Sequence, residues 1–145
     1  MTDLEKQGDD LWRKVIAEKF EHRCFICRLH DSQPVNGAPH SAHHLVKRRF
    51  HLCRYDINCG CYLCSHDHDK AERSEAWLLE QLNDIYIFTS QVPGNAKYNI
   101  ARSTEARRMH FYIEAHKNPA IVRYTPEMMA DIIDQLEQAY DIYKV

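Results

Sequence analysis

Hydrophobic residues recur at helical spacing over most of the chain, which predicts a largely helical protein. In residues 9–22 the apolar side chains fall three and four positions apart, as on the buried face of an amphipathic helix. Residues 77–82 show the same spacing, and Ala106–His116 forms another predicted helix, which Pro119 ends. These segments leave only short stretches for strands and turns.

The last helix is the best-defined predicted element. Thr125 is a suitable N-cap, Pro126 suits the first helical position, and Glu127 complements the positive end of the helix dipole. One apolar stripe follows, formed by Met129, Ile132, Ile133, Leu136, Tyr140 and Tyr143. Such a stripe is typical of a core or of a partner surface, so this helix is also the expected contact of a homodimer.

Two short strands are predicted between the helices. They comprise Ser41–Val46 and approximately Gly60–Leu63, and Ser65 is expected to cap the helix that follows. Residues 28–40 and 90–99 contain glycine, proline and asparagine, which indicate a loop and a turn. The predicted fold class is therefore α+β and mostly helical, in a single domain of 145 residues.

Charge is distributed unevenly along the chain although the formal net charge is only −2. Lys and Arg against Asp and Glu count 4 to 5 in residues 1–20, 8 to 6 in residues 21–73, and 7 to 10 in residues 74–145. The middle segment is the only net positive one, and it contains all six cysteines and eight of the ten histidines. Any nucleic-acid contact is therefore expected in this segment.

No apolar run approaches the roughly 20 residues of a membrane span, and the first twenty residues do not resemble a signal peptide. We therefore expect a cytoplasmic protein, in the host cytoplasm if a phage encodes it. In that compartment six cysteines favour metal binding over disulfides. A disulfide-stapled or redox protein remains the alternative, because the cysteine count is even.

The cysteines include two CxxC pairs. Cys24 and Cys27 form the first pair and Cys61 and Cys64 the second, a spacing at which two thiolates can reach one tetrahedral zinc ion. Two such pairs separated by a hairpin can clip a structural Zn²⁺ where the local core is thin. The alternative is that the cysteines are buried as small apolar residues.

Three histidines predict a second, hydrolytic site. His43 and His44 are neighbours on a predicted strand, where successive side chains point to opposite faces, and His68 lies on the next helix. A hairpin packed on that helix would bring His43 and His68 to one cation that keeps positions open for water and phosphate oxygens. His44 would remain able to take a proton from the attacking water.

These features occur in a recognisable order. They are the Cys24–Cys27 pair, His43-His44, the basic Lys47-Arg48-Arg49, the triplet Arg54-Tyr55-Asp56, Gly60, Leu63-Cys64 and His68. In this order they resemble the finger of ββα-metal, or HNH, endonucleases, and most closely that of phage recombination endonucleases of the NinG/Rap kind. Residues 123–140 are similar to the segment that opens the family's long C-terminal helix. The resemblance covers most of residues 9–143 and is dense only in residues 24–70.

The resemblance implies a zinc-braced, treble-clef-like ββα-metal finger at about residues 22–73, with a helical part at about residues 74–145. It implies a metal-dependent DNA endonuclease of phage recombination or DNA processing, with branched or single-stranded DNA as candidate substrates. By resemblance, His44 is the general base, and His43 and His68 bind the catalytic Mg²⁺, Mn²⁺ or Zn²⁺. The other expected function is a zinc-stabilised nucleic-acid or protein-binding module that has lost catalysis.

Four basic residues are expected to contact DNA phosphates in this picture. By resemblance, Lys47, Arg48, Arg49 and Arg54 would hold phosphates that flank the scissile one. Arg48 and Arg54 are counted with the catalytic residues, and Lys47, Arg48 and Arg49 with the DNA-binding ones. The alternative is that they form a solvated basic loop.

The sequence departs from the family pattern at two positions. The family's middle asparagine, which ties the finger loop together, falls on Cys59, and Asn58 substitutes only if the chain slips by one residue. The family's last zinc cysteine falls on Asp67, so the fourth zinc ligand beside Cys24, Cys27 and Cys64 is either Asp67 or Cys61. Sulfur is the softer and better-matched donor for zinc, which favours Cys61. A degraded site that binds no zinc is the third alternative.

Overall fold

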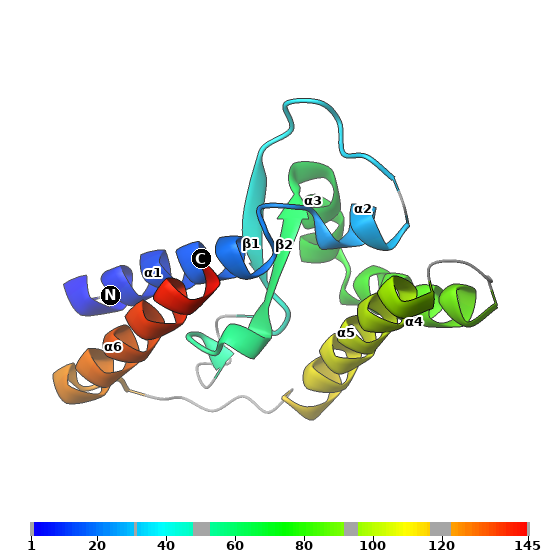
Figure 1. The fold of residues 1–145 in the computed structure, drawn as a ribbon. Helices are drawn as coiled ribbons and strands as arrows, with labels where there is room; N and C mark the ends of the chain where they lie inside the picture. The colour runs from blue at the N-terminus through cyan, green and yellow to red at the C-terminus, as the bar shows by residue number, and fades with distance from the viewer. Residues whose placement is uncertain (1, 31, 48–52, 92–95, 117–122, 145) are drawn as a thin grey trace.

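The protein is α+β and mostly helical, as expected, with one two-stranded antiparallel sheet (Figure 1). This computed structural model describes residues 2–30, 32–47, 53–91, 96–116 and 123–144, with the side chains of residues 84–103 excepted. In chain order the elements are α1 (Asp3–Lys19), α2 (Phe25–Leu29), β1 (His40–His44), the 3₁₀ turn η2 (Ile57–Cys59), β2 (Gly60–Cys64), α3 (Ser65–Arg73), α4 (Glu75–Gln91), α5 (Ala96–Ala115) and α6 (Pro126–Tyr143).

The helix ends follow local hydrogen-bonding chemistry. Helix α1 begins earlier than predicted because Thr2 and Glu5 form a capping box, in which each side chain bonds the other residue's backbone N–H. The predicted start of α6 is confirmed, since Thr125 Oγ1 accepts a hydrogen bond from the backbone of Met128. The prediction for α3 is wrong, because Cys64 is the N-cap and Ser65 is already helical.

Two other boundaries differ from the sequence prediction. Strand β1 ends at His44 because the next two backbone N–H groups bond Cys59. The N–H of Leu45 donates to the Cys59 backbone oxygen, and the N–H of Val46 donates to the Cys59 sulfur. Helix α4 continues to Gln91 and α5 already starts at Ala96, so residues 90, 91 and 96–99, which were predicted to form a turn, are helical. Pro119 lies outside the described residues.

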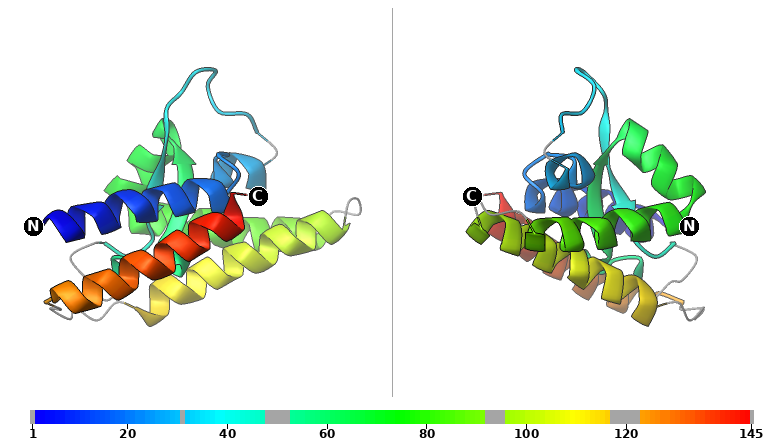
Figure 2. Two further views of the ribbon diagram at one scale, coloured as in Figure 1. Left: turned by 60° about the vertical axis from the view of Figure 1, so that its left-hand side comes forward. Right: turned by 90° about the vertical axis from the view of Figure 1, so that its right-hand side faces the viewer.

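Helix α1 lies between the sheet and α6, and it runs side by side with α6 in the same direction (Figures 1 and 2). Gly60 allows α1 to approach the sheet closely, because a Cβ atom there would collide with the side chain of Ile16. The ring of Trp12 also lies against Gly60, and Trp12 and Val15 are both fully buried. Helices α4 and α5 pack against each other as a second helical pair (Figure 2). Among the described helices, none combines the length and apolar character that crossing a bilayer requires.

A buried ion pair joins α1 to the loop before η2. The guanidinium of Arg54 donates from Nε to Asp9 Oδ1 at 3.0 Å and from Nη2 to Asp9 Oδ2 at 2.7 Å. Both residues are buried, with 8% and 4% of their surface exposed. This fork-to-fork geometry satisfies two hydrogen bonds at once and holds the loop to the helix.

We predict that Asp9→Asn lowers the free energy of unfolding by at most about 3–5 kcal/mol, because it removes the buried carboxylate charge that pairs with Arg54 and leaves the more distant Glu5, at 3.5 Å, as a carboxylate neighbour. The neighbouring Asp10 makes an exposed pair with Arg13, so Asp10→Asn should cost at most about 1 kcal/mol. Urea unfolding of both variants measures the difference. Equal losses would contradict a structural role for the buried pair.

Candidate metal centres and catalytic histidine

Helix α3 contributes to two separate clusters of metal-ligating side chains. One consists of Cys24, Cys27, Cys64 and Asp67, and the other of His43, His68 and Glu72. Within each cluster the candidate ligand atoms all lie within 4.8 Å of one another. Because consecutive helical residues point about 100° apart, neighbouring positions on α3 can serve different sites.

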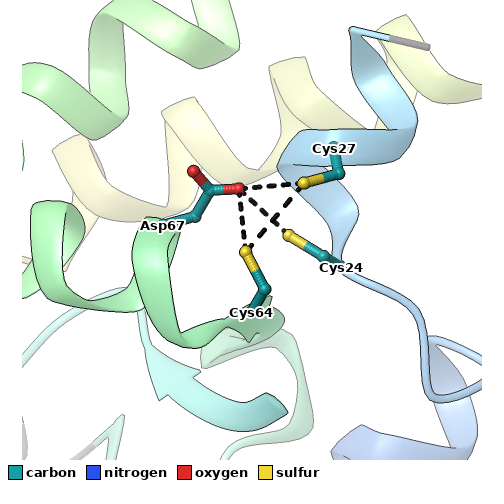
Figure 3. A group of neighbouring side chains, drawn as sticks. All are labelled: Cys24, Cys27, Cys64 and Asp67. Atoms are coloured by element: carbon teal, nitrogen blue, oxygen red, sulfur yellow. Dashed lines mark hydrogen bonds between the residues drawn. The ribbon is translucent and has the colours of Figure 1, made fainter. Parts of the chain in front are cut away.

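In the first cluster, one carboxylate oxygen faces three sulfur atoms (Figure 3). Asp67 Oδ2 lies 3.2 Å from Cys24 Sγ, 3.3 Å from Cys27 Sγ and 3.4 Å from Cys64 Sγ. The sulfur atoms of Cys27 and Cys64 are 4.0 Å apart. A tetrahedral Zn²⁺ with ordinary bond lengths needs ligand separations of about 3.5–3.8 Å, so these four side chains fit such an ion.

Local structure explains why these four side chains converge. Cys24 is the N-cap of the short helix α2 and Cys27 lies one turn later, so both thiols face the same direction. Cys64 ends β2 and caps α3, whose first turn contains Asp67. Burial raises the pKa of the Cys24 thiol and raises that of Cys27 to about 11. The thiols are therefore protonated at neutral pH unless a cation displaces the protons.

The preference for Cys61 as the fourth ligand is wrong. Cys61 and Cys64 are three residues apart on β2, and side chains at odd spacing on a strand point to opposite faces. Cys61 is fully buried on the other face, where Lys19 and Glu105 are among its charged neighbours. Asp67 occupies the fourth position instead.

The disulfide-stapled alternative also fails against the structure. All six cysteines are free thiols, and all are buried. Cys24, Cys27 and Cys64 were expected to ligate zinc with either Cys61 or Asp67, and the cluster contains these three cysteines and Asp67.

The second cluster brings His43 and His68 together, as the sequence predicted from the hairpin and helix. Their ring centroids are 5.2 Å apart, at nearly right angles. Glu72 Oε1 lies 3.1 Å from His43 Nδ1 and 3.5 Å from His68 Nε2, so the carboxylate completes a three-residue set. Sequence reasoning missed Glu72, although its position four residues after His68 indicates a shared helix face.

The environment of His43 favours a neutral ring. His43 is 6% exposed, and this burial lowers the pKa of its imidazole to about 4, against the opposing effect of the nearby Glu72 carboxylate. Above that pH the ring carries a lone pair that a divalent cation can use. His68 is partly exposed and Glu72 more so, so the cluster opens toward solvent on the α3 side.

His44 points to the other face of β1, as the strand alternation predicted. Its ring stacks on Trp12, with centroids 3.8 Å apart and an interplanar angle of 7°. Its Nε2 lies 3.0 Å from the backbone oxygen of Arg54. Because a carbonyl can only accept, Nε2 must carry the proton, and in the neutral ring the lone pair is then on Nδ1.

The structure corrects the expected role of Arg54 and leaves the other basic residues as expectations. Arg54 cannot reach a phosphate, since its guanidinium is buried against Asp9, with Glu5 only 3.5 Å away. Lys47 is exposed beyond the end of β1. Arg48 and Arg49 lie outside the described residues.

Cys59 occupies the loop-tying position and Asn58 does not replace it. The backbone oxygen of Cys59 accepts from Leu45 N at 2.7 Å, while its sulfur lies 3.4 Å from Val46 N and 3.6 Å from Val46 O. Cys59 is fully buried. The exposed Asn58 contributes backbone contacts, with its N–H donating to Asp56 Oδ1 and its oxygen accepting from Arg108 Nη1.

We predict that Asp67→Ala lowers zinc affinity at least about tenfold, because it removes one of four convergent ligands. Asp67→Cys should retain zinc, since thiolate suits this ion well. Zinc per chain by elemental analysis and competition with a chromophoric chelator measure both effects. Cys61→Ala is the matched control and should bind zinc like the parent. Zinc loss in Cys61→Ala but not in Asp67→Ala would contradict this ligand set.

We also predict that His43 makes stability depend on pH. Its pKa is about 4 in the folded protein against 6.5 normally, so the unfolded state binds more protons between these values. The stabilisation that the neutral His43 gives the folded protein is therefore complete above the pKa of 6.5. As the pH falls toward 4, the free energy of unfolding decreases by at most about 3 kcal/mol. His43→Gln should flatten this dependence in urea unfolding with chelator present. His22→Gln, at an exposed histidine, should leave it unchanged.

Comparison with known proteins identifies no family for this chain. No family model matches the chain, and neither a curated protein nor a solved structure does. A function therefore has to be proposed from the described side chains and their chemistry.

Proposed function

We propose that this protein is a metal-dependent DNA endonuclease of the HNH type. The observation that carries the proposal is the convergence of His43, His68 and Glu72, with His44 next to the first of these ligands on β1. An antiparallel hairpin followed by a helix holds all four residues, in the order that the ββα-metal finger requires. The resemblance of residues 24–70 to that finger supports the same conclusion.

The second cluster suits a hydrolytic cation. Two imidazoles and one carboxylate occupy three positions of an ion such as Mg²⁺, Mn²⁺ or Zn²⁺ and leave others for water and phosphate oxygens. When bound, the ion supplies Lewis-acid stabilisation of charge on the phosphate and on the leaving oxygen. The neutral, buried His43 and the solvent-facing Glu72 would hold it at the edge of α3.

We assign His44 as the general base of this reaction. Its Nε2 proton is committed to the Arg54 carbonyl, so Nδ1 is the atom that accepts a proton from water. The phosphodiester bond to the leaving oxygen breaks as the water oxygen bonds to phosphorus. The proton of that water passes to His44.

The Cys₃Asp cluster would hold a structural Zn²⁺ that braces a treble-clef-like finger. Its ligands come from α2, the end of β2 and the first turn of α3. Zinc there would anchor the helix that presents His68 and Glu72. No reaction step passes through this cluster.

DNA would approach the protein near Lys47, the first residue of the basic run Lys47-Arg48-Arg49. This residue is exposed, and Arg48 and Arg49 follow it in sequence. Phosphate contacts by such a cluster position the duplex without reading its sequence. The resemblance also implies branched or single-stranded DNA as substrate and a role in phage recombination or DNA processing. A cytoplasmic location and a homodimer formed through α6, both expected from the sequence pattern, complete this proposal.

The test is nicking of supercoiled plasmid and cleavage of branched DNA in Mg²⁺ or Mn²⁺. His44→Ala is expected to lower the rate by about 10²–10⁴-fold, the usual contribution of a general base. Glu72→Gln should raise the metal concentration needed for half-maximal rate. His66→Ala is the matched control, because His66 is an exposed histidine on α3, the helix that also contains Glu72.

If parent and variants are equally silent with Mg²⁺, Mn²⁺ and Zn²⁺ on every substrate, the endonuclease proposal is wrong. A zinc-stabilised binding module that has lost catalysis would then describe the protein better. Residual cleavage of equal rate in parent and His44→Ala would point to a contaminating nuclease and would equally contradict the proposal.

A further inference from the structure

The indole of Trp12 covers one face of the His44 ring. Trp12 lies on α1, and its ring is nearly parallel to the imidazole, 3.8 Å away between centroids. Only 1% of Trp12 is exposed, so the indole is held within the core and presents one flat face to the histidine. Aromatic contacts of this kind define the plane of both rings.

The plane of Trp12 is itself held by the loop between the strands. Its Nε1–H donates to the backbone oxygen of Asp56 at 2.9 Å. The carboxylate of Asp56 accepts from Tyr112 Oη at 2.7 Å and from the backbone N–H of Asn58 at 2.9 Å. Through Tyr112, helix α5 therefore holds Asp56, and Asp56 in turn holds the indole of Trp12.

The same loop also fixes the direction in which the His44 ring points. Its Nε2–H donates to the carbonyl of Arg54, two residues before Asp56. A hydrogen bond in the ring plane sets the direction in which the ring points, whereas the stack sets the plane itself. Because the χ2 torsion of histidine is broad by nature, both constraints are needed to define one orientation.

We infer that Trp12 is a positioning residue for His44, which rests on the proposed function of His44 as general base. Trp12 is buried behind the imidazole and is out of reach of a substrate, so it would act on catalysis by positioning His44. The stack and the Arg54 carbonyl together hold the proton-accepting nitrogen in one direction. A displacement of about 1 Å at such an atom can cost about 10²-fold in rate.

The geometric part of this inference is tested by NMR on the intact, zinc-loaded protein. A parallel indole at this distance shifts the carbon-bound ring protons of His44 upfield through its ring current. The signals are assigned with His44→Gln. Trp12→Leu is expected to return them to the positions shown by exposed histidines such as His22.

The kinetic part compares three variants in the plasmid assay with Mg²⁺. Trp12→Leu is expected to lower kcat by about 10²-fold, with KM changed less than about twofold because no substrate contact is lost. Trp12→Phe retains a stacking face and should recover most of kcat. Phe20→Leu removes the buried aromatic at the C-cap of α1, which touches Phe25 instead of His44, and it should retain kcat. Circular dichroism selects a temperature at which all variants are folded.

Each outcome supports or overturns the inference. An upfield His44 signal with loss of kcat only in Trp12→Leu supports it, while equal losses in Trp12→Leu and Phe20→Leu overturn it. An active parent protein whose His44 signals lie at ordinary positions overturns it even if Trp12→Leu fails to fold. If the parent protein is inactive although its His44 signals are shifted upfield, the proposed function is wrong, and the stack of Trp12 on His44 then has no catalytic role.

Discussion

The packing of helix α1 against the β1–β2 hairpin is the contact on which the rest of the structure depends. Gly60 has no side chain, so Ile16 and Trp12 can settle directly on the start of β2. The same helix contributes Asp9 to the buried pair with Arg54. Apolar burial and one satisfied ion pair thus fix the hairpin and its loop to a single rigid helix, and both faces of β1 acquire a defined environment.

Helix α3 contributes side chains to two chemically different candidate metal centres. Its first turn directs Asp67 toward three thiols, while His68 and Glu72 face the imidazole of His43. The first centre is closed, with four buried or nearly buried ligands that suit a structural ion, and the second has three ligands and opens toward solvent. The Asp67 carboxylate links the two, because a cation held there would also fix the helix that presents His68 and Glu72.

Much of the site was accessible from the sequence, because its elements are short and its ligands lie close in the chain. Strand alternation predicted that His43 and His44 point apart, and the hairpin followed by a helix predicted that His68 meets His43. Alternation also argues against Cys61 and Cys64 as partners, but their CxxC spacing obscured it. Glu72 was detectable from its four-residue spacing to His68, although exposed carboxylates at that spacing are common on helices.

The sequence by itself determined the helical periodicity, the α6 cap at Thr125, the cysteine and histidine inventory and the hairpin that carries it, since these follow from local chemistry and strand geometry. Only the tertiary structure decided which carboxylates matter. Asp67 completes a set of thiols, whereas Asp9 neutralises Arg54 and withdraws it from any phosphate. Trp12 and Tyr112 come from helices distant in sequence, so their contacts to His44 and Asp56 depend on packing that no local pattern encodes.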